Sequence, residues 1–166
     1  MADTTPSTPL GVPEHESCNT PVIHAFKAFL GTFGFAVEAE RDVGGLRSGD
    51  TAYDHWLREA ELAWERTSRD ALAVFQTEAL QPSDQPLRQT AMLIRHALAS
   101  ESHDDFVSVQ AMLDAEPLTF MATGTSPMAC RANEMIGTAI GRLDQIAAMS
   151  MILNDPELDD PASWSA

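Results

Sequence analysis

The chain has 166 residues, of which 44% are hydrophobic, so it can bury one core but is short for two domains. Its formal net charge of −15 comes from 25 acidic residues against 10 basic ones. Such a charge repels phosphate backbones and anionic lipids, so binding to nucleic acid or to a membrane surface is disfavoured, whereas a basic partner protein would be attracted.

The N-terminal segment, residues 1–20, is rich in proline and threonine and has no apolar period, which predicts a disordered tail. It lacks the basic start and the apolar run of a secretory signal. The cysteines Cys18 and Cys130 lie far apart and form no CxxC pair, so neither a disulfide framework nor a thiolate metal site is predicted. These features fit a reducing, cytoplasmic location.

The first predicted helix covers residues 21–41, with a proline at its start and two glycines beyond its end. It is apolar almost all round, and its longest apolar run is shorter than the stretch of about 20 residues that spans a bilayer. A helix of this kind is either buried at the centre of a fold or shared with another chain. Because a small bundle has little room to enclose it on every side, we expect an exposed apolar surface that binds a partner, formed by Phe26, Phe29, Phe33 and Phe35.

Three further helices are predicted over residues 51–80, 86–100 and 102–116. Asp50 is a candidate N-cap for the first of them, which combines an apolar stripe with acid-first ion pairs four residues apart. This pattern is typical of an ordinary amphipathic bundle helix. Residues 118–121 are the only candidate strand, and a single strand would have no partner to pair with.

The last predicted helix begins at Pro127, with Ser126 as its cap, and runs to about residue 153. Opposite its apolar stripe lies a row of small residues that includes Cys130, Gly137 and Gly141. Each glycine inside a helix costs about 1 kcal/mol relative to alanine. Two glycines on a nominally exposed face suggest that another backbone approaches there, although they could also be tolerated without a purpose.

The C-terminal segment, residues 154–166, contains prolines and acids and predicts a second flexible tail. Trp164 stands alone in it, as in a short peptide that becomes ordered in a partner's groove, or the tail is simply an inert acidic one. The sequence therefore predicts an all-α fold. We expect a helical bundle over residues 21–153, with four main helices and one or two short ones.

No motif in the sequence predicts an active site. The five histidines form neither a Glu-x-x-His pair nor an HExxH motif, and no GxSxG sequence is present. The glycine-rich segment 44–50 lacks the lysine of a P-loop. His55 and Glu59 are better explained as a surface pair, and the segment 103–105 as helix capping. We predict no catalytic residue, no cofactor and no metal ligand.

These features favour a non-enzymatic module that contacts another protein or a second copy of itself, such as an adaptor, regulator, assembly factor or dedicated chaperone. A small non-catalytic subunit of a larger enzyme complex is the main alternative. An autonomous metal-dependent enzyme that uses His55, Glu59 or residues 103–105 has less support. A DNA-mimic inhibitor is suggested by the net charge alone.

Overall fold

The computed structural model describes residues 19–45, 52–100, 103–115 and 117–153 of the chain. These residues form five α-helices and one short 3₁₀-helix, and they contain no strand: α1 (Pro21–Gly44), α2 (Tyr53–Gln76), α3 (Asp84–Ala99), α4 (His103–Ala115), η1 (Pro117–Phe120) and α5 (Pro127–Leu153). The predicted all-α bundle is confirmed. Residues 118–121, the candidate strand that would have lacked a partner, form no strand, and Pro117–Phe120 is the 3₁₀-helix η1.

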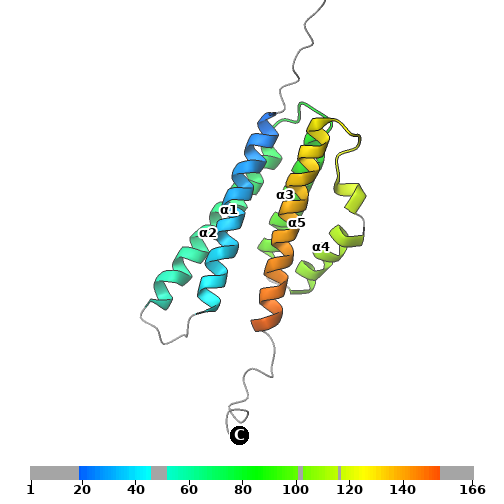
Figure 1. The fold of residues 1–166 in the computed structure, drawn as a ribbon. Coiled ribbons are helices and arrows are strands. Elements are labelled where there is room, and N and C mark those ends of the chain that lie inside the picture. The colour runs from blue at the N-terminus through cyan, green and yellow to red at the C-terminus, as the bar shows by residue number, and fades with distance from the viewer. Residues whose placement is uncertain (1–18, 46–51, 101–102, 116, 154–166) are drawn as a thin grey trace, which may run out of the picture.

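Helices α1, α2, α3 and α5 form the four-helix bundle, and α4 lies outside it. α1 packs most extensively against α2 and also contacts α3 and α5, while α3 contacts both α2 and α5. α4 and η1 contact each other and cover parts of α3 and α5. Figure 1 shows α1 and α2 as one pair, α3 and α5 as a second pair, and α4 beside the second pair.

The main core is built around the three phenylalanines Phe26, Phe29 and Phe33 of α1, which are all 0% exposed. Phe26 meets Phe29 edge to face, and Phe29 stacks on Phe33 with a centroid distance of 5.5 Å. The expectation that these three rings form an exposed surface is wrong. Apolar side chains of α2, α3 and α5 surround this face of α1, because the helix sits where the other three bundle helices converge.

A second, smaller cluster packs the C-terminal half of α1 against the N-terminal half of α2. It consists of the alanines Ala36, Ala39, Ala60 and Ala63, with Trp64 packed against it. The Trp64 indole N–H donates to Glu40 Oε2 at 2.9 Å, which satisfies the polar end of the ring. Alanines allow two helices to approach closely, so this end of the bundle is a tight two-helix contact.

A buried carboxylate ties the start of α1 to the start of α3. Asp84 is 0% exposed and accepts hydrogen bonds from the Thr20 hydroxyl at 2.5 Å and from the backbone N–H groups of Leu80 and Gln81. Thr20 in turn caps α1, since its hydroxyl oxygen accepts from the Ile23 N–H. The loop between α2 and α3 is thereby fixed against the N-terminus of the bundle.

The predicted helix ends agree with the structure to within a few residues, except that α2 ends at Gln76 rather than near residue 80. Arg88 explains this end: its guanidinium donates twice to the Phe75 carbonyl and lies 5.3 Å from the Phe75 ring centroid. Ser126 caps α5 as predicted, because its hydroxyl oxygen accepts from the Ala129 N–H. Asp50, Cys18, residues 1–18 of the predicted N-terminal tail and the whole predicted C-terminal tail lie outside the described residues. Thr20, which is part of the predicted N-terminal tail, is instead a buried cap of α1.

Candidate interaction surface

The sequence-predicted interaction residues of α1 reduce to one aromatic side chain. Phe35 is 48% exposed, whereas Phe26, Phe29 and Phe33 belong to the core. Its neighbours on the outer side of the helix are small or polar, including Ala28, Gly31 and Glu38. A single exposed phenylalanine in such surroundings is common on protein surfaces and does not form an apolar patch.

The row of small residues on α5 faces solvent in the single chain. Cys130 and Gly137 are exposed and Gly141 is half-buried. A methyl group added at Gly137 or at Gly141 would meet nothing within 4 Å in the described part of the chain. The backbone that we expected to approach these glycines therefore does not come from another described helix. Cys130 is a free thiol whose Sγ lies 3.9 Å from the Thr125 carbonyl oxygen.

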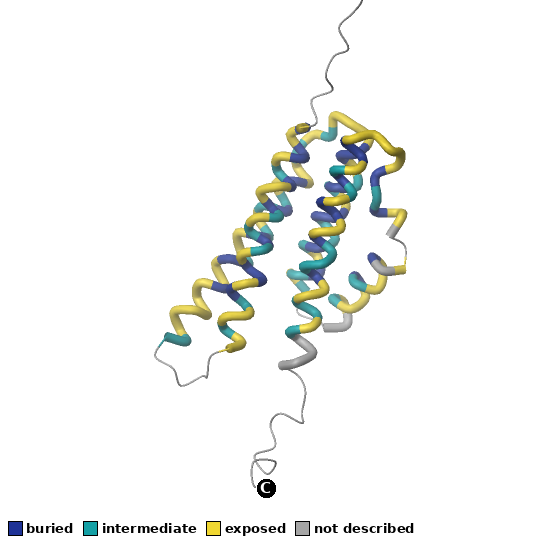
Figure 2. Tube along the Cα trace, viewed as in Figure 1, coloured by how far each residue is buried: buried dark blue, intermediate teal, exposed yellow. Residues whose placement is uncertain are grey.

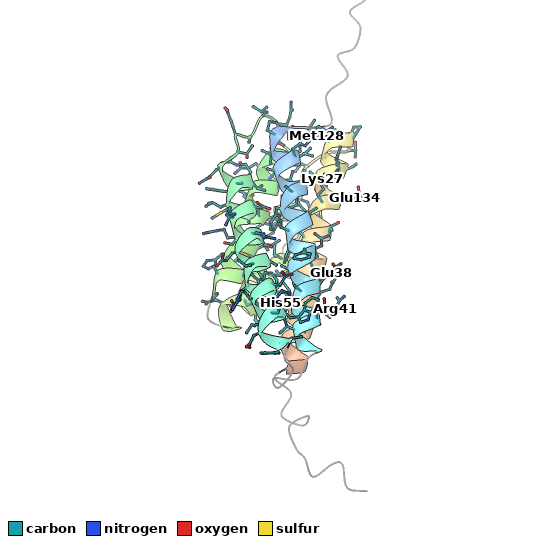
Figure 3. The ribbon with its side chains drawn as sticks, turned by 90° about the vertical axis from the view of Figure 1, so that its left-hand side faces the viewer. Lys27, Glu38, Arg41, His55, Met128 and Glu134 are labelled. Carbon is teal, nitrogen blue, oxygen red and sulfur yellow. The ribbon has the colours of Figure 1, made fainter. Side chains whose placement is uncertain are left out.

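The close approach between α1 and α5 occurs at a different glycine, Gly34. The Arg142 side chain of α5 lies across it and donates a hydrogen bond to the Leu30 carbonyl oxygen of α1. Burial lowers the pKa of Arg142 from its ordinary value, while the nearby charge of Glu38 opposes this shift. Figure 3 shows Lys27 and Glu38 along α1 and Glu134 on the neighbouring α5. The α1–α5 seam is thus closed by a charged side chain and serves the fold.

Three large apolar side chains of α4 and η1 are exposed, as are Leu62 and Phe75 of α2 and Leu80 of the α2–α3 loop. Val107 is 44% exposed, Met112 49% and Leu118 84%, and Ala111 is exposed as well. We call these four residues the α4–η1 surface. At 100° per residue, Val107 and Met112 border the outward side of α4 and Ala111 lies between them. Leu118 follows in η1, which contacts α4.

The α4–η1 surface is exposed because α4 is apolar on both its inner and its outer sides. Val109 and Leu113 point into the core and Phe106 is half-buried against it. Figure 2 shows few buried positions along α4 compared with α3 and α5. α4 is thus fixed to the bundle by one narrow face, and no described element covers the other.

The stretch of sequence that carries this surface has acids but no basic lysine or arginine. From residue 97 to residue 130 the sequence contains no lysine or arginine but has five acids, Glu101, Asp104, Asp105, Asp114 and Glu116. Asp105 is exposed and accepts from the Ser100 hydroxyl at 2.9 Å. Sequence positions 104, 107, 111 and 114 are three, four and three residues apart, which places them along one side of a helix. The two middle positions are apolar and the two outer positions are acidic.

The remaining candidates from the sequence are His55 and Glu59, residues 103–105 and Trp164. His55 and Glu59 are both exposed on α2. In Figure 3, His55 lies at the end of the bundle where α1 ends and α2 begins. No group of three or more histidine, cysteine or acidic side chains that could hold a metal ion occurs among the described residues. A shallow hollow near the same end is lined by Arg41, Asp42, Gly45 and Trp56. Trp164 lies outside the described residues.

Comparisons with protein families, with characterised proteins and with solved structures give no match. Within the described part of the chain, α1 alone is long and apolar enough to cross a membrane by length and composition. A core helix passes the same test, and the most apolar face of α1 is buried in the bundle.

The α4–η1 surface was not predicted from the sequence. The available signal was the segment from Phe106 to Leu113, in which apolar residues occupy nearly every side of a short helix. We applied that criterion to α1, where the apolar character is stronger.

Proposed function

We propose that this protein is a non-enzymatic module that binds another protein through the α4–η1 surface. The supporting observation is that Val107, Met112 and Leu118 are each more than two-fifths exposed on elements that only partly cover α3 and α5. Exposed apolar side chains gathered on one side of a small domain are a common mark of a protein–protein contact. Methionine suits such a contact, because its flexible and polarisable side chain adapts to a partner.

The roles of adaptor, regulator, assembly factor or dedicated chaperone all use a surface of this kind. The same holds for a small non-catalytic subunit of a larger enzyme complex, which remains the second candidate. A cytoplasmic location accords with the proposal, because a reduced Cys130 and an acidic surface suit that compartment. The DNA-mimic alternative has weaker support, because the acids of the chain alternate with arginines along the exposed side of α2.

The test is affinity purification of three forms of the chain from the native host, followed by mass spectrometry. The forms are the wild type, the double variant Met112→Ser/Leu118→Ser, and the control Phe35→Ser, which removes an equally exposed apolar side chain from α1. We expect one partner to be recovered in fixed stoichiometry with the wild type and with the control, and to be lost from the double variant. Recovery of the same proteins with all three forms would contradict the proposal.

A further inference from the structure

We infer that the partner of the α4–η1 surface is a basic amphipathic helix that lays its apolar side against Val107, Met112 and Leu118. This inference rests on the proposed function and specifies the chemistry of the partner. The occupant is deduced from the apolar side chains, from the charge around them and from the position of that charge on α4.

The apolar side chains define the contact face of the occupant. Val107, Ala111 and Met112 present a convex helical surface, and the exposed Leu118 follows in η1, which contacts α4. A helix that packs on such a row places its own apolar residues at intervals of three and four. A peptide that binds by strand addition would need an open strand edge, and the described part of the chain contains no strand.

The charge of this segment indicates which polar side chains the partner helix carries. Five acids and no lysine or arginine occur between residues 97 and 130, within a chain of net charge −15. A second copy of this chain would bring the same acids against them, so like charges oppose self-association through this face. Lysine and arginine at the edges of an incoming helix would instead pair with these acids and accelerate the encounter.

Helix stability alone does not account for this placement of acids. Acids near the start of α4 complement the helix dipole, but Asp114 lies in the last turn, where a negative charge opposes it. The last turn of α4 contains no basic residue. By this criterion, position 114 is an unfavourable place for an acid in an isolated helix, and a basic residue of an incoming helix would offset its charge.

The test uses synthetic peptides with the full-length chain and measures binding by isothermal titration calorimetry at low and at high salt. The first peptide is an amphipathic helix of leucines and lysines. The second has glutamates in place of the lysines, and the third has the composition of the first in an order that destroys the apolar face. We expect only the first to bind, and its affinity to fall as salt rises because screening weakens the charge pairing.

Matched variants locate the site. Met112→Asn/Leu118→Asn and, separately, Asp104→Lys/Asp114→Lys should each weaken binding of the lysine peptide by about tenfold or more. The controls each make one change of the same kind on α1, as Phe35→Asn and Glu38→Lys, and should leave the affinity within about twofold. Circular dichroism and urea unfolding of each variant verify that it remains folded.

Three results would overturn the inference. The first is equal binding of the lysine and glutamate peptides. The second is an affinity that depends on the α1 variants as strongly as on the α4 variants. The third is a concentration-dependent dimer, detected by sedimentation, that is lost in Met112→Asn/Leu118→Asn.

These outcomes are distinguishable from a failure of the proposed function. If a native partner depends on Met112 and Leu118 but not on Asp104 and Asp114, the interaction module stands and only the basic chemistry of its partner is wrong. If no native partner depends on either pair, both proposals fail.

Discussion

Helices α1 and α4 both carry apolar side chains on more than one side but lie in different environments. Each is apolar on more than one side, yet α1 is enclosed by three bundle helices while α4 is fixed along one narrow face. Phe26, Phe29 and Phe33 of α1 are 0% exposed, whereas Met112 of α4 is about half exposed. Apolar character on several sides therefore does not by itself identify an interface, because the number of neighbouring helices decides whether that character is core or surface.

The largest expected effect tests whether the phenylalanine core of α1 is buried. Phe29→Ala removes a ring that packs against both Phe26 and Phe33 and should lower the free energy of unfolding by about 3–5 kcal/mol. Phe35→Ala, on the exposed side of the same helix, should cost less than about 1 kcal/mol. Urea unfolding followed by circular dichroism measures both variants. Equal losses would show that the two rings are buried to the same extent.

The buried carboxylate should give the next largest effect. Asp84→Ala leaves the Thr20 hydroxyl and two backbone N–H groups without their acceptor, which should cost about 2–3 kcal/mol. Asp105→Ala is the matched control, because this carboxylate is exposed and accepts one hydroxyl bond, and it should cost about 0.5 kcal/mol. Thermal unfolding of the two variants checks the ranking, and an Asp84→Ala protein as stable as the control would contradict the buried network.

Replacing a glycine of α5 or α1 by alanine should have a smaller effect on the free energy of unfolding, and this effect should be stabilising. Gly137→Ala should stabilise the isolated chain by about 1 kcal/mol, because alanine is the better helix former and nothing in the described chain meets its methyl group. Gly34→Ala should gain less, because its methyl group lies 2.9 Å from the Arg142 guanidinium and displaces it from Leu30. Urea midpoints of both variants decide the order. A destabilising Gly137→Ala would indicate that a neighbouring backbone does pack there.

The smallest expected effect concerns the α4–η1 surface itself. Met112→Ser and Leu118→Ser should each change the free energy of unfolding by no more than about 0.5 kcal/mol, because neither side chain is part of the core. Thermal shift measurements at equal protein concentration are sufficient. A large loss of stability from either change would show that the residue is packed within the chain rather than available to a partner.

The helices were predictable because their signals are local. Pro21, Pro127 and Ser126 mark helix starts through backbone geometry and capping, and the structure uses each of them in that way. The end of α2 was not predictable from the same signals, since Arg88 reaches it from the next helix. A single side-chain contact from a neighbouring helix does not appear in the hydrophobic periodicity of either sequence.

The candidate site was less predictable than the fold. Phe35 was correctly placed on the outside of α1, but Phe26, Phe29 and Phe33 were not, because three helices converge on the face that carries them. The exposure of Met112 and Leu118 likewise follows from the place of α4 outside the bundle. Single-sequence periodicity shows which sides of a helix are apolar, and tertiary packing determines which of those sides are covered.

Hydroxyl-radical footprinting of the wild-type chain, alone and with the basic leucine–lysine peptide, tests the central claim most directly. In the free chain we predict strong labelling of Met112 and Leu118, moderate labelling of Phe35 and protection of Phe29. The peptide should protect Met112 and Leu118 and leave Phe35 unchanged. Strong labelling of Phe29 in the free chain, or protection of Phe35 in place of the α4–η1 residues, would contradict the account.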